Sequence, residues 1–244
     1  MNSTSARYGC GPRQNQLLAA LPDVAWKWWQ EHLEPMELEC GQVLCDRSST
    51  PAFVYFPTTA VVSLLCMTQD GGSAEIAVVG NDGMVGIPLF MGGNAMPSQA
   101  VVQSAGRGYR LRAQAATREA NRDRPVLDIL LRYAQSVIAQ VAQTALCNRY
   151  HTIDQQLCRR LLLGLDRSAC DELAMTQELV ANLLGVRREG VTVAALKLQE
   201  AGVIRYSRGH IAVLDRRRLE ARACECYAAA KTEYARLLPT PLAA

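Results

Sequence analysis

Residues 175–214 of this 244-residue chain read MTQELVANLLGVRREGVTVAALKLQEAGVIRYSRGHIAVL. Thr176 is of a residue type that caps helices, and apolar residues at helical spacing follow it as far as Leu184. Gly185 comes next, and glycine adopts the left-handed conformation of a tight turn without a steric penalty. We therefore predict a helix over residues 177–184 that ends in a tight turn at Gly185.

A second helix is predicted over residues 187–200, with a basic start and with Gly202 as its end. Residues 203–206 and 210–213 then alternate around a short turn, as a two-stranded wing would. This is the layout of a winged helix-turn-helix, whose second helix enters the major groove of DNA. An ordinary helical hairpin in a core would share part of the pattern, but the cap, both glycines, the basic start and the wing together favour DNA binding. The apolar stripe of the second helix is Val191, Ala194, Ala195 and Leu198.

Composition describes a globular chain that is long enough for two domains. Hydrophobic residues make up 49% and charged residues 20%, and the net charge of +3 is compatible with nucleic acid. No run of 18 apolar residues and no apolar secretory segment occur, so we expect a cytoplasmic location and no membrane partner. We also find no nucleophile–base pair, no glycine-rich phosphate loop with a lysine and no HExxH motif, which argues against an enzyme.

The cysteines and histidines do not predict a metal site. No CxxC pair occurs, and the three histidines (His32, His151 and His210) are scattered. We therefore expect small buried or incidental thiols, no metal and no cofactor. The nine cysteines are Cys10, Cys40, Cys45, Cys66, Cys147, Cys158, Cys170, Cys224 and Cys226.

The part of the chain that precedes these helices changes character twice. A helical pattern with three tryptophans covers residues 16–33, and short β-rich runs at 53–56, 60–65, 74–79 and 100–103 alternate with glycine and asparagine turns. Many short strands at regular spacing indicate a β-barrel or jelly roll. A long helical pattern then extends from Pro125 to about Arg149, and another covers residues 151–165.

Two apolar stripes run along the long helical pattern, so both of its sides need a cover. The β-domain can cover one side, and a second copy of the same helix can cover the other, which predicts a homodimer. The alternative is a helix buried within one chain. The residues expected in the dimer interface are Leu130, Ala134, Val137, Ile138, Val141 and Ala145.

In this order, a β-roll, a bridging helix and a winged helix resemble the Crp/Fnr superfamily of bacterial transcription regulators. The resemblance rests on residues 185–192 (GVRREGVT), 198–204 (LQEAGVI) and, in the roll, 54–57 (VYFP) and 83–86 (GMVG). It implies an α+β fold with an N-terminal β-roll or jelly-roll sensor domain and a C-terminal winged helix-turn-helix domain. The expected boundaries are 1–16 for a flexible leader, 17–122 for the sensor domain, 123–150 for the dimerisation helix, 151–227 for the DNA-binding domain and 228–244 for a tail.

The resemblance also implies which residues contact DNA. Arg188 and Glu189 occupy base-reading positions, and their chemistry fits guanine and cytosine respectively. Val193 stands where the catabolite-activator branch has a further arginine, and Arg187 could replace that contact. The residues expected to read bases are Arg187, Arg188, Glu189 and Thr192, and those expected to contact phosphates are Thr176, Gln177, Lys197, Arg205 and Arg208.

The sensor end departs from the cyclic-nucleotide pattern of the family. Ile87 follows Gly86 where a glutamate would hold the ribose, and no arginine lies between Gly83 and Gly106 to neutralise a phosphate. Cyclic AMP bound in the usual mode is therefore not expected. The candidate signals are another small molecule such as a cyclic dinucleotide, a thiol redox change, or no signal. The expected effector pocket consists of Gly83, Gly86, Ile87, Ser98 and Gln99.

We thus expect a homodimeric regulator that binds pseudo-palindromic double-stranded DNA, with RNA polymerase as a further partner. The alternative function is a small-molecule sensor whose winged helix contacts a protein.

Overall fold

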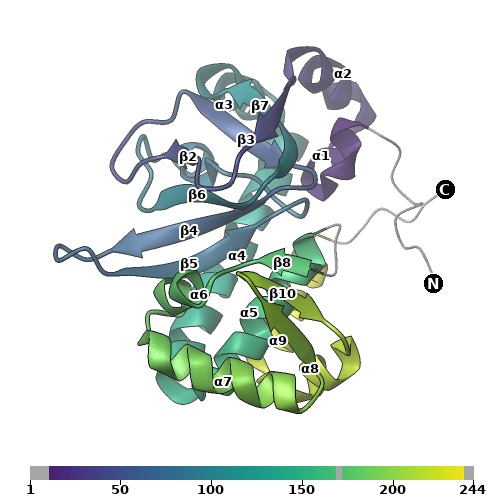
Figure 1. Ribbon diagram of the computed structural model, residues 1–244. Helices are drawn as coiled ribbons and strands as arrows, with labels where there is room; N and C mark the ends of the chain where they lie inside the picture. Colours follow the sequence, from purple (N-terminus) through teal and green to yellow (C-terminus); the bar gives the residue numbers. More distant parts are fainter. Residues whose placement is uncertain (1–10, 169–171, 239–244) are drawn as a thin grey trace.

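The computed structural model of the protein describes residues 11–168 and 172–238 (Figure 1). A β-roll is followed by one long helix and by a helical domain that carries a small sheet. The elements are η2 (Pro12–Gln14), α1 (Gln16–Ala19), α2 (Asp23–His32), β1 (Glu34–Leu38), β2 (Val43–Cys45), β3 (Phe53–Pro57), β4 (Val61–Met67), β5 (Ser73–Val79), η3 (Ile87–Met91), β6 (Gln99–Ser104), β7 (Gly106–Arg112), α3 (Ala113–Arg122), α4 (Arg124–Tyr150), α5 (Ile153–Arg167), β8 (Glu172–Ala174), α6 (Gln177–Leu184), α7 (Arg188–Glu200), β9 (Ile204–Ser207), β10 (His210–Val213), α8 (Arg216–Arg222) and α9 (Cys226–Leu237).

The roll consists of two antiparallel sheets with the strand orders β2-β6-β4-β5 and β1-β7-β3. The four predicted β-rich runs correspond to β3, β4, β5 and β6, so the expected β-roll is confirmed. The sequence did not predict β1, β2, β7 or α3. Strand β7 has a basic, glycine-containing sequence, yet it pairs on both sides because its backbone, not an apolar side-chain pattern, holds it in the sheet.

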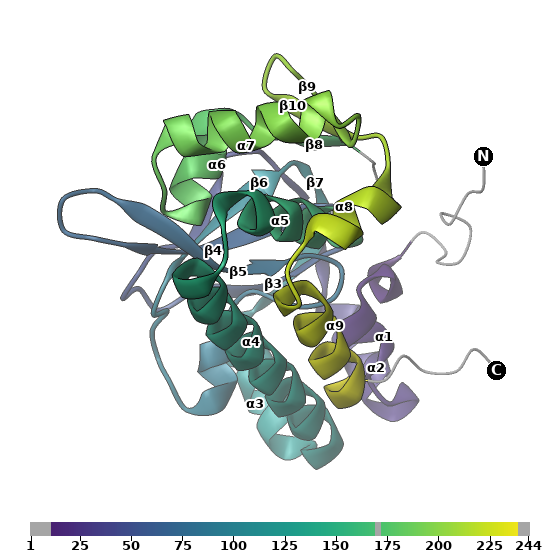
Figure 2. The same cartoon turned by 90° about the horizontal axis from the view of Figure 1, so that it is seen from below.

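Helix α4 lies beneath the roll and presents two different faces (Figure 2). Leu130 and Ala134 are buried in a core that also contains the roll, α1 and the end of α9. The sequence predicted these two residues in the dimer interface, whereas packing within the subunit already covers them. Val137 and Val141 pack against the cores of the roll, whereas Ile138 is 56% exposed.

The C-terminal domain has the predicted helix-turn-helix. Helix α6 begins after Thr176, whose hydroxyl oxygen accepts a hydrogen bond from the Leu179 amide at 3.1 Å. It ends at Gly185, which is left-handed with φ 66°. Strands β9 and β10 form the predicted wing, and β8 extends it to a three-stranded sheet in the order β8-β10-β9.

Both ends of the described chain are more ordered than the sequence suggested. Asn15, within the predicted leader, is fully buried and donates hydrogen bonds to the carbonyl oxygens of Pro57 and Gly83. The region predicted as a tail contains α9, which packs along α4 and ends with Leu237 in the core of the roll. The region predicted as a tail therefore includes most of α9, whose apolar residues pack into a core. Residues 1–10 and 239–244, with Cys10, lie outside the described residues, as does Cys170.

Among the described residues, the model contains no helix with the length and apolar character that a bilayer crossing requires.

Candidate functional site

The first turn of α7 presents charged side chains to solvent. Arg187 is the N-cap residue of the helix, and Arg188 and Glu189 form its first turn; all three are exposed. The opposite face, with Val191, Ala194, Ala195 and Leu198, is buried against α5 and α6. The helix therefore has one face that fixes it to the domain and one free end that carries two guanidinium groups and a carboxylate.

Thr192 holds the two helices of the motif together. Its hydroxyl group lies 2.8 Å from Gln177 Oε1 and 3.0 Å from the carbonyl oxygen of Arg188, and it can donate to either. Two of the predicted DNA contacts are thus bonded to each other. Thr176, a predicted phosphate contact, is exposed and caps α6.

The other predicted phosphate contacts lie on the exterior of the domain. Arg208 and Gly209 both have positive φ, 49° and 82°, as a tight two-residue hairpin turn requires. Arg205 and Arg208 are exposed beside a surface depression of about 310 Å³ in the wing. Lys197 is also exposed and forms an ion pair of 2.9 Å with Asp154 of α5.

Two buried arginines of α5 connect this domain to the roll. Arg160 pairs with Glu75 of β5, at 2.5 Å between Nε and Oε1, and both side chains are at most 5% exposed. Arg167 pairs with Asp82 in the turn after β5, at 2.6 Å between Nη2 and Oδ2. Desolvation lowers the pKa of Arg160, although the neighbouring Glu75 carboxylate opposes this shift. A charged group buried in the low-dielectric interior is costly unless it keeps its partner, so these ion pairs fix α5 against β5.

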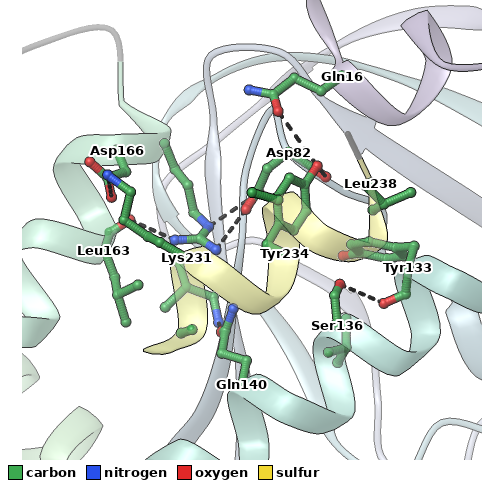
Figure 3. A pocket seen from close by; sticks show the side chains of 15 residues that line it. Gln16, Asp82, Tyr133, Ser136, Gln140, Leu163, Asp166, Lys231, Tyr234 and Leu238 are labelled. Carbon is green, nitrogen blue, oxygen red and sulfur yellow. Dashed lines mark hydrogen bonds and ion pairs between the residues drawn. The ribbon is translucent and has the colours of Figure 1, made fainter. Parts of the chain in front are cut away.

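A cavity of about 310 Å³ lies between α4, α5 and α9 (Figure 3). Asp82, Arg167, Tyr133 and Tyr234 contribute its polar lining. Tyr133 donates a hydrogen bond to the Met84 carbonyl oxygen at 3.1 Å, and Tyr234 donates one to the Asp82 carbonyl oxygen at 2.6 Å. Burial, with a smaller contribution from the Asp82 charge, raises the pKa of both phenols, so both stay neutral donors.

The residues predicted for an effector pocket do not line this cavity, nor the wider depression of about 630 Å³ beside α3. Ile87 is 6% and Ser98 1% exposed, and Ile87 belongs to the hydrophobic core. Gly83 lies so close to Tyr133 that a side chain there would overlap the ring. Gln99 donates a hydrogen bond to Asp46 Oδ1 at 2.7 Å. The sequence identified the turn after β5 as part of the site. It did not predict that the cavity at this turn is lined by residues of α4, α5 and α9.

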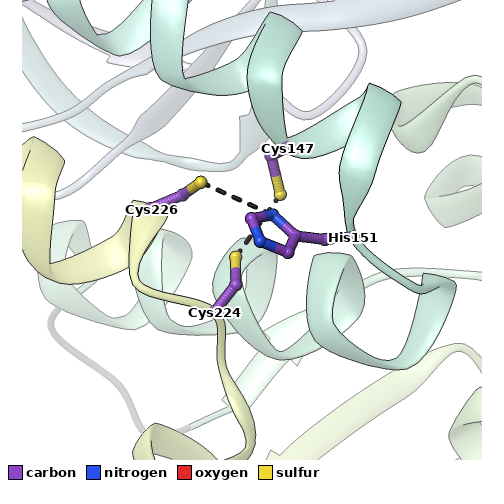
Figure 4. A group of neighbouring side chains, drawn as sticks. All are labelled: Cys147, His151, Cys224 and Cys226. Atoms are coloured by element: carbon purple, nitrogen blue, oxygen red, sulfur yellow. Dashed lines mark hydrogen bonds between the residues drawn. The ribbon is translucent and has the colours of Figure 1, made fainter.

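Sequence reasoning missed one group of side chains altogether. Cys147 and His151 at the end of α4 meet Cys224 and Cys226 at the start of α9 (Figure 4). The sequence predicted small buried or incidental thiols; these three thiols are buried, but they lie together with a histidine because folding joins segments 77 residues apart. The available signal was a cysteine and a histidine one helical turn apart together with the Cys-x-Cys spacing.

The described chain is thus a β-roll protein with a winged helix-turn-helix that exposes a basic recognition helix. Residues 155–222 match the model of the Crp-like helix-turn-helix domain. None of the curated proteins matches the chain in sequence.

Solved structures share the whole architecture. A regulator assigned to the crp/fnr family from Eubacterium rectale has a TM-score of 0.65 at 18% identity, covering 86% of this chain and 98% of that one. FixK2 from Bradyrhizobium japonicum has a TM-score of 0.65 at 16% identity, covering 79% and 98%. The c-di-GMP responsive regulator CLP from Xanthomonas campestris has a TM-score of 0.61 at 14% identity, covering 80% and 100%.

Residues 155–222 are therefore similar to the Crp-like helix-turn-helix domain, and the described chain shares the fold of these solved regulators.

Proposed function

We propose that the protein is a homodimer that recognises pseudo-palindromic DNA by placing the first turn of α7 from each subunit in a major groove. The observation that carries the proposal is the exposed end of α7, where Arg187, Arg188 and Glu189 project from a helix whose other face is buried. A rigid support matters here, because base recognition needs side chains held at fixed positions along the groove.

The chemistry of these side chains assigns their roles. Arg188 can donate two parallel hydrogen bonds to guanine O6 and N7, and Glu189 can accept one from cytosine N4. Arg187 and Thr192 complete the proposed set of base contacts. We assign phosphate contacts, which set the register of the protein on the duplex, to Thr176, Gln177, Lys197, Arg205 and Arg208.

The dimer is proposed from the exposed side of α4. Leu131, Ile138 and Ala145 are exposed there and lie seven residues apart. Gln135 and Ala142, also exposed, lie between them, so the row follows the 4-3 spacing of a coiled-coil seam. Ile138 and Ala145 belong to the interface predicted from the sequence, whereas Leu130 and Ala134 do not reach this side. A second copy of α4 would cover the seam.

For the sensor domain we propose a ligand other than cyclic AMP in its usual mode. Ile87 packs into the hydrophobic core beside Gly86, so this position offers no carboxylate to a ribose. A phosphate held there would lose its water without gaining a cationic partner, which is unfavourable. A cyclic dinucleotide remains among the small molecules to be assayed.

One observation favours a second function, in which the winged helix binds a protein. Val193 and Leu196 on α7 are 52% and 50% exposed, and exposed apolar side chains suit a protein contact. They suit thymine methyl groups equally well, so the salt dependence of binding must distinguish DNA binding from protein binding.

The experiment selects duplexes from a random pool with the full chain and measures affinity for the selected site at several salt concentrations. The proposal predicts two inverted half-sites about 34 Å apart and binding that weakens steeply with salt, because cations are released from the DNA phosphates. Binding to a protein partner that hardly changes with salt, with no sequence enriched from the pool, would support the second function instead.

A further inference from the structure

The cysteine–histidine group joins two elements that are distant in sequence. Cys147 lies in the last turn of α4, and His151 is the residue at which that helix ends. Cys224 lies in the connection between α8 and α9, and Cys226 is the first residue of α9. The four potential ligand atoms all lie within 4.8 Å of one another (Figure 4).

The distances within the group match those around one tetrahedral ion. Cys147 Sγ lies 3.5 Å from Cys224 Sγ, and Cys226 Sγ lies 3.6 Å from His151 Nδ1. With Zn–S bonds of about 2.3 Å and Zn–N bonds of about 2.0 Å, tetrahedral angles separate ligand atoms by roughly 3.5–3.8 Å. The thiols therefore already lie near their liganded separations.

We propose that Cys147, His151, Cys224 and Cys226 form a structural zinc site with a Cys3His ligand set. Thiolate and imidazole ligands in a four-coordinate arrangement are those that zinc prefers in proteins. Four protein ligands leave no open position for water or substrate, so the ion holds the fold and performs no chemistry.

A carboxylate orients the histidine for this role. The ring of His151 presents Nδ1 to Cys226, and its other nitrogen, Nε2, lies 3.2 Å from Glu225 Oε1. Ligating histidines commonly donate the hydrogen of their second nitrogen to a carboxylate, which fixes the tautomer and strengthens the ligand. Glu225 stands between the two cysteines of the second segment, so one three-residue stretch supplies two ligands and their support.

The surrounding charge also suits the loaded site. Binding of Zn²⁺ displaces three thiol protons to solvent and leaves a centre with a net charge of −1. Arg159 of α5 is only 5% exposed, and its Nε lacks a hydrogen-bond partner among the described residues. Its guanidinium group lies within electrostatic range of Cys147 and Cys226. This buried cation would compensate the charge of the zinc centre.

The position of the site defines its structural effect. The ion would attach the end of α4 to the α8–α9 connection, beside the junction where the chain passes from α4 into α5. It would thereby fix how α9 returns along α4 to the roll. A disulfide between Cys147 and Cys224 is the competing state of two of these thiols, and it would exclude the ion.

The test measures metal in the full chain, purified without chelator, and then titrates chelator-treated, reduced protein with Co²⁺ as a spectroscopic probe. The proposal predicts one zinc per chain and, with Co²⁺, the intense visible and near-ultraviolet bands of a tetrahedral site with thiolate ligands. Glu225→Gln should weaken Co²⁺ binding by about 10- to 100-fold while the bands keep their positions.

Two cysteine variants separate this site from other thiols. Cys226→Ser should lose the tetrahedral spectrum, whereas Cys66→Ser, which changes an exposed thiol of β4, should keep it. Circular dichroism reports whether each variant is folded. The proposal is overturned if the reduced wild-type chain gives only the weak bands of octahedral Co²⁺, if both variants bind Co²⁺ alike, or if mass analysis finds a Cys147–Cys224 disulfide in place of zinc.

Discussion

Arg188 is the side chain on which the proposed base recognition depends most. It occupies the first turn of α7, and its carbonyl oxygen lies 3.0 Å from the Thr192 hydroxyl group, which also contacts Gln177 of α6. Thr192 therefore donates its one hydroxyl hydrogen either to α6 or to the Arg188 carbonyl oxygen of its own helix. The side chain itself is exposed and free to enter a groove.

Arg188→Ala should weaken binding to the selected DNA site by about 1–3 kcal/mol and should relax the preference for one base pair, because a bidentate contact is lost. Binding to a scrambled duplex should change much less. Fluorescence anisotropy with both duplexes measures the two effects, and Arg122→Ala, at the exposed end of α3, serves as the control. Equal losses on both duplexes would assign Arg188 to phosphate contact.

Residues that interact with neighbours in sequence could be predicted from the sequence. Residues that contact each other only after distant segments have folded together could not. Thr176 and Gly185 follow capping and turn chemistry that operates within a few residues, and both have the predicted geometry. Cys147 and Cys224 lie 77 residues apart, and no local pattern states that α9 returns to α4. The site of these cysteines therefore required the three-dimensional structure.

Helix α9 is the element that most changes the organisation inferred from sequence. It leaves the winged-helix domain and ends in the core of the roll, with Leu237 5% exposed. Its apolar residues pack against α4 and α5, so tertiary packing stabilises the helix more than its own weak periodicity does. Strand β7 is similar, since neighbouring strands and not an alternating pattern determine it.

Leu237→Ala tests whether α9 belongs to the fold. Removing a buried leucine side chain should lower the free energy of unfolding by about 2–4 kcal/mol, through lost burial and the cavity that remains. Thr232→Ala, at an exposed position of the same helix, should change it by less than about 0.5 kcal/mol. Urea denaturation measures both, and identical stabilities would mean that α9 does not pack as described.

The ion pair between α5 and β5 offers a second test at this scale. Glu75→Gln leaves Arg160 buried without its carboxylate and should destabilise the protein by about 3–5 kcal/mol. Glu34→Gln removes a pair with Arg110 whose side chains are 47% and 39% exposed, and it should cost at most about 1 kcal/mol. Comparable midpoints of urea unfolding in the two variants would show that the pair is not buried in solution.

In the proposed dimer, α4 contacts its own β-roll on one side and a second copy of α4 on the other. One side of the helix packs against the β-roll, and the other side exposes the seam of Leu131, Ile138 and Ala145. The sequence predicted both stripes but could not tell which residues face inward, because two adjacent stripes differ by only one residue in phase. Leu130 and Leu131 show the difference, at 1% and 38% exposure.

Ile138→Glu should dissociate the dimer without unfolding the subunit. Its side chain is 56% exposed in the single chain, whereas in the seam a carboxylate would be buried against its own copy. We expect the dimer dissociation constant to rise at least about 100-fold, which corresponds to about 2.7 kcal/mol. Sedimentation velocity measures it, with Gln143→Glu, which adds the same charge beside the seam on the same helix, as the control. An unchanged dimer would place the interface elsewhere.

The central claim is that two chains present two recognition helices to one duplex. The most direct measurement is the mass of the complex between the 26.7 kDa chain and a selected duplex, by native mass spectrometry or light scattering. The account predicts two chains per duplex, and a smaller fraction of that complex with Arg188→Ala at the same concentration. A complex with one chain per duplex, or equal binding to a scrambled sequence, would contradict it.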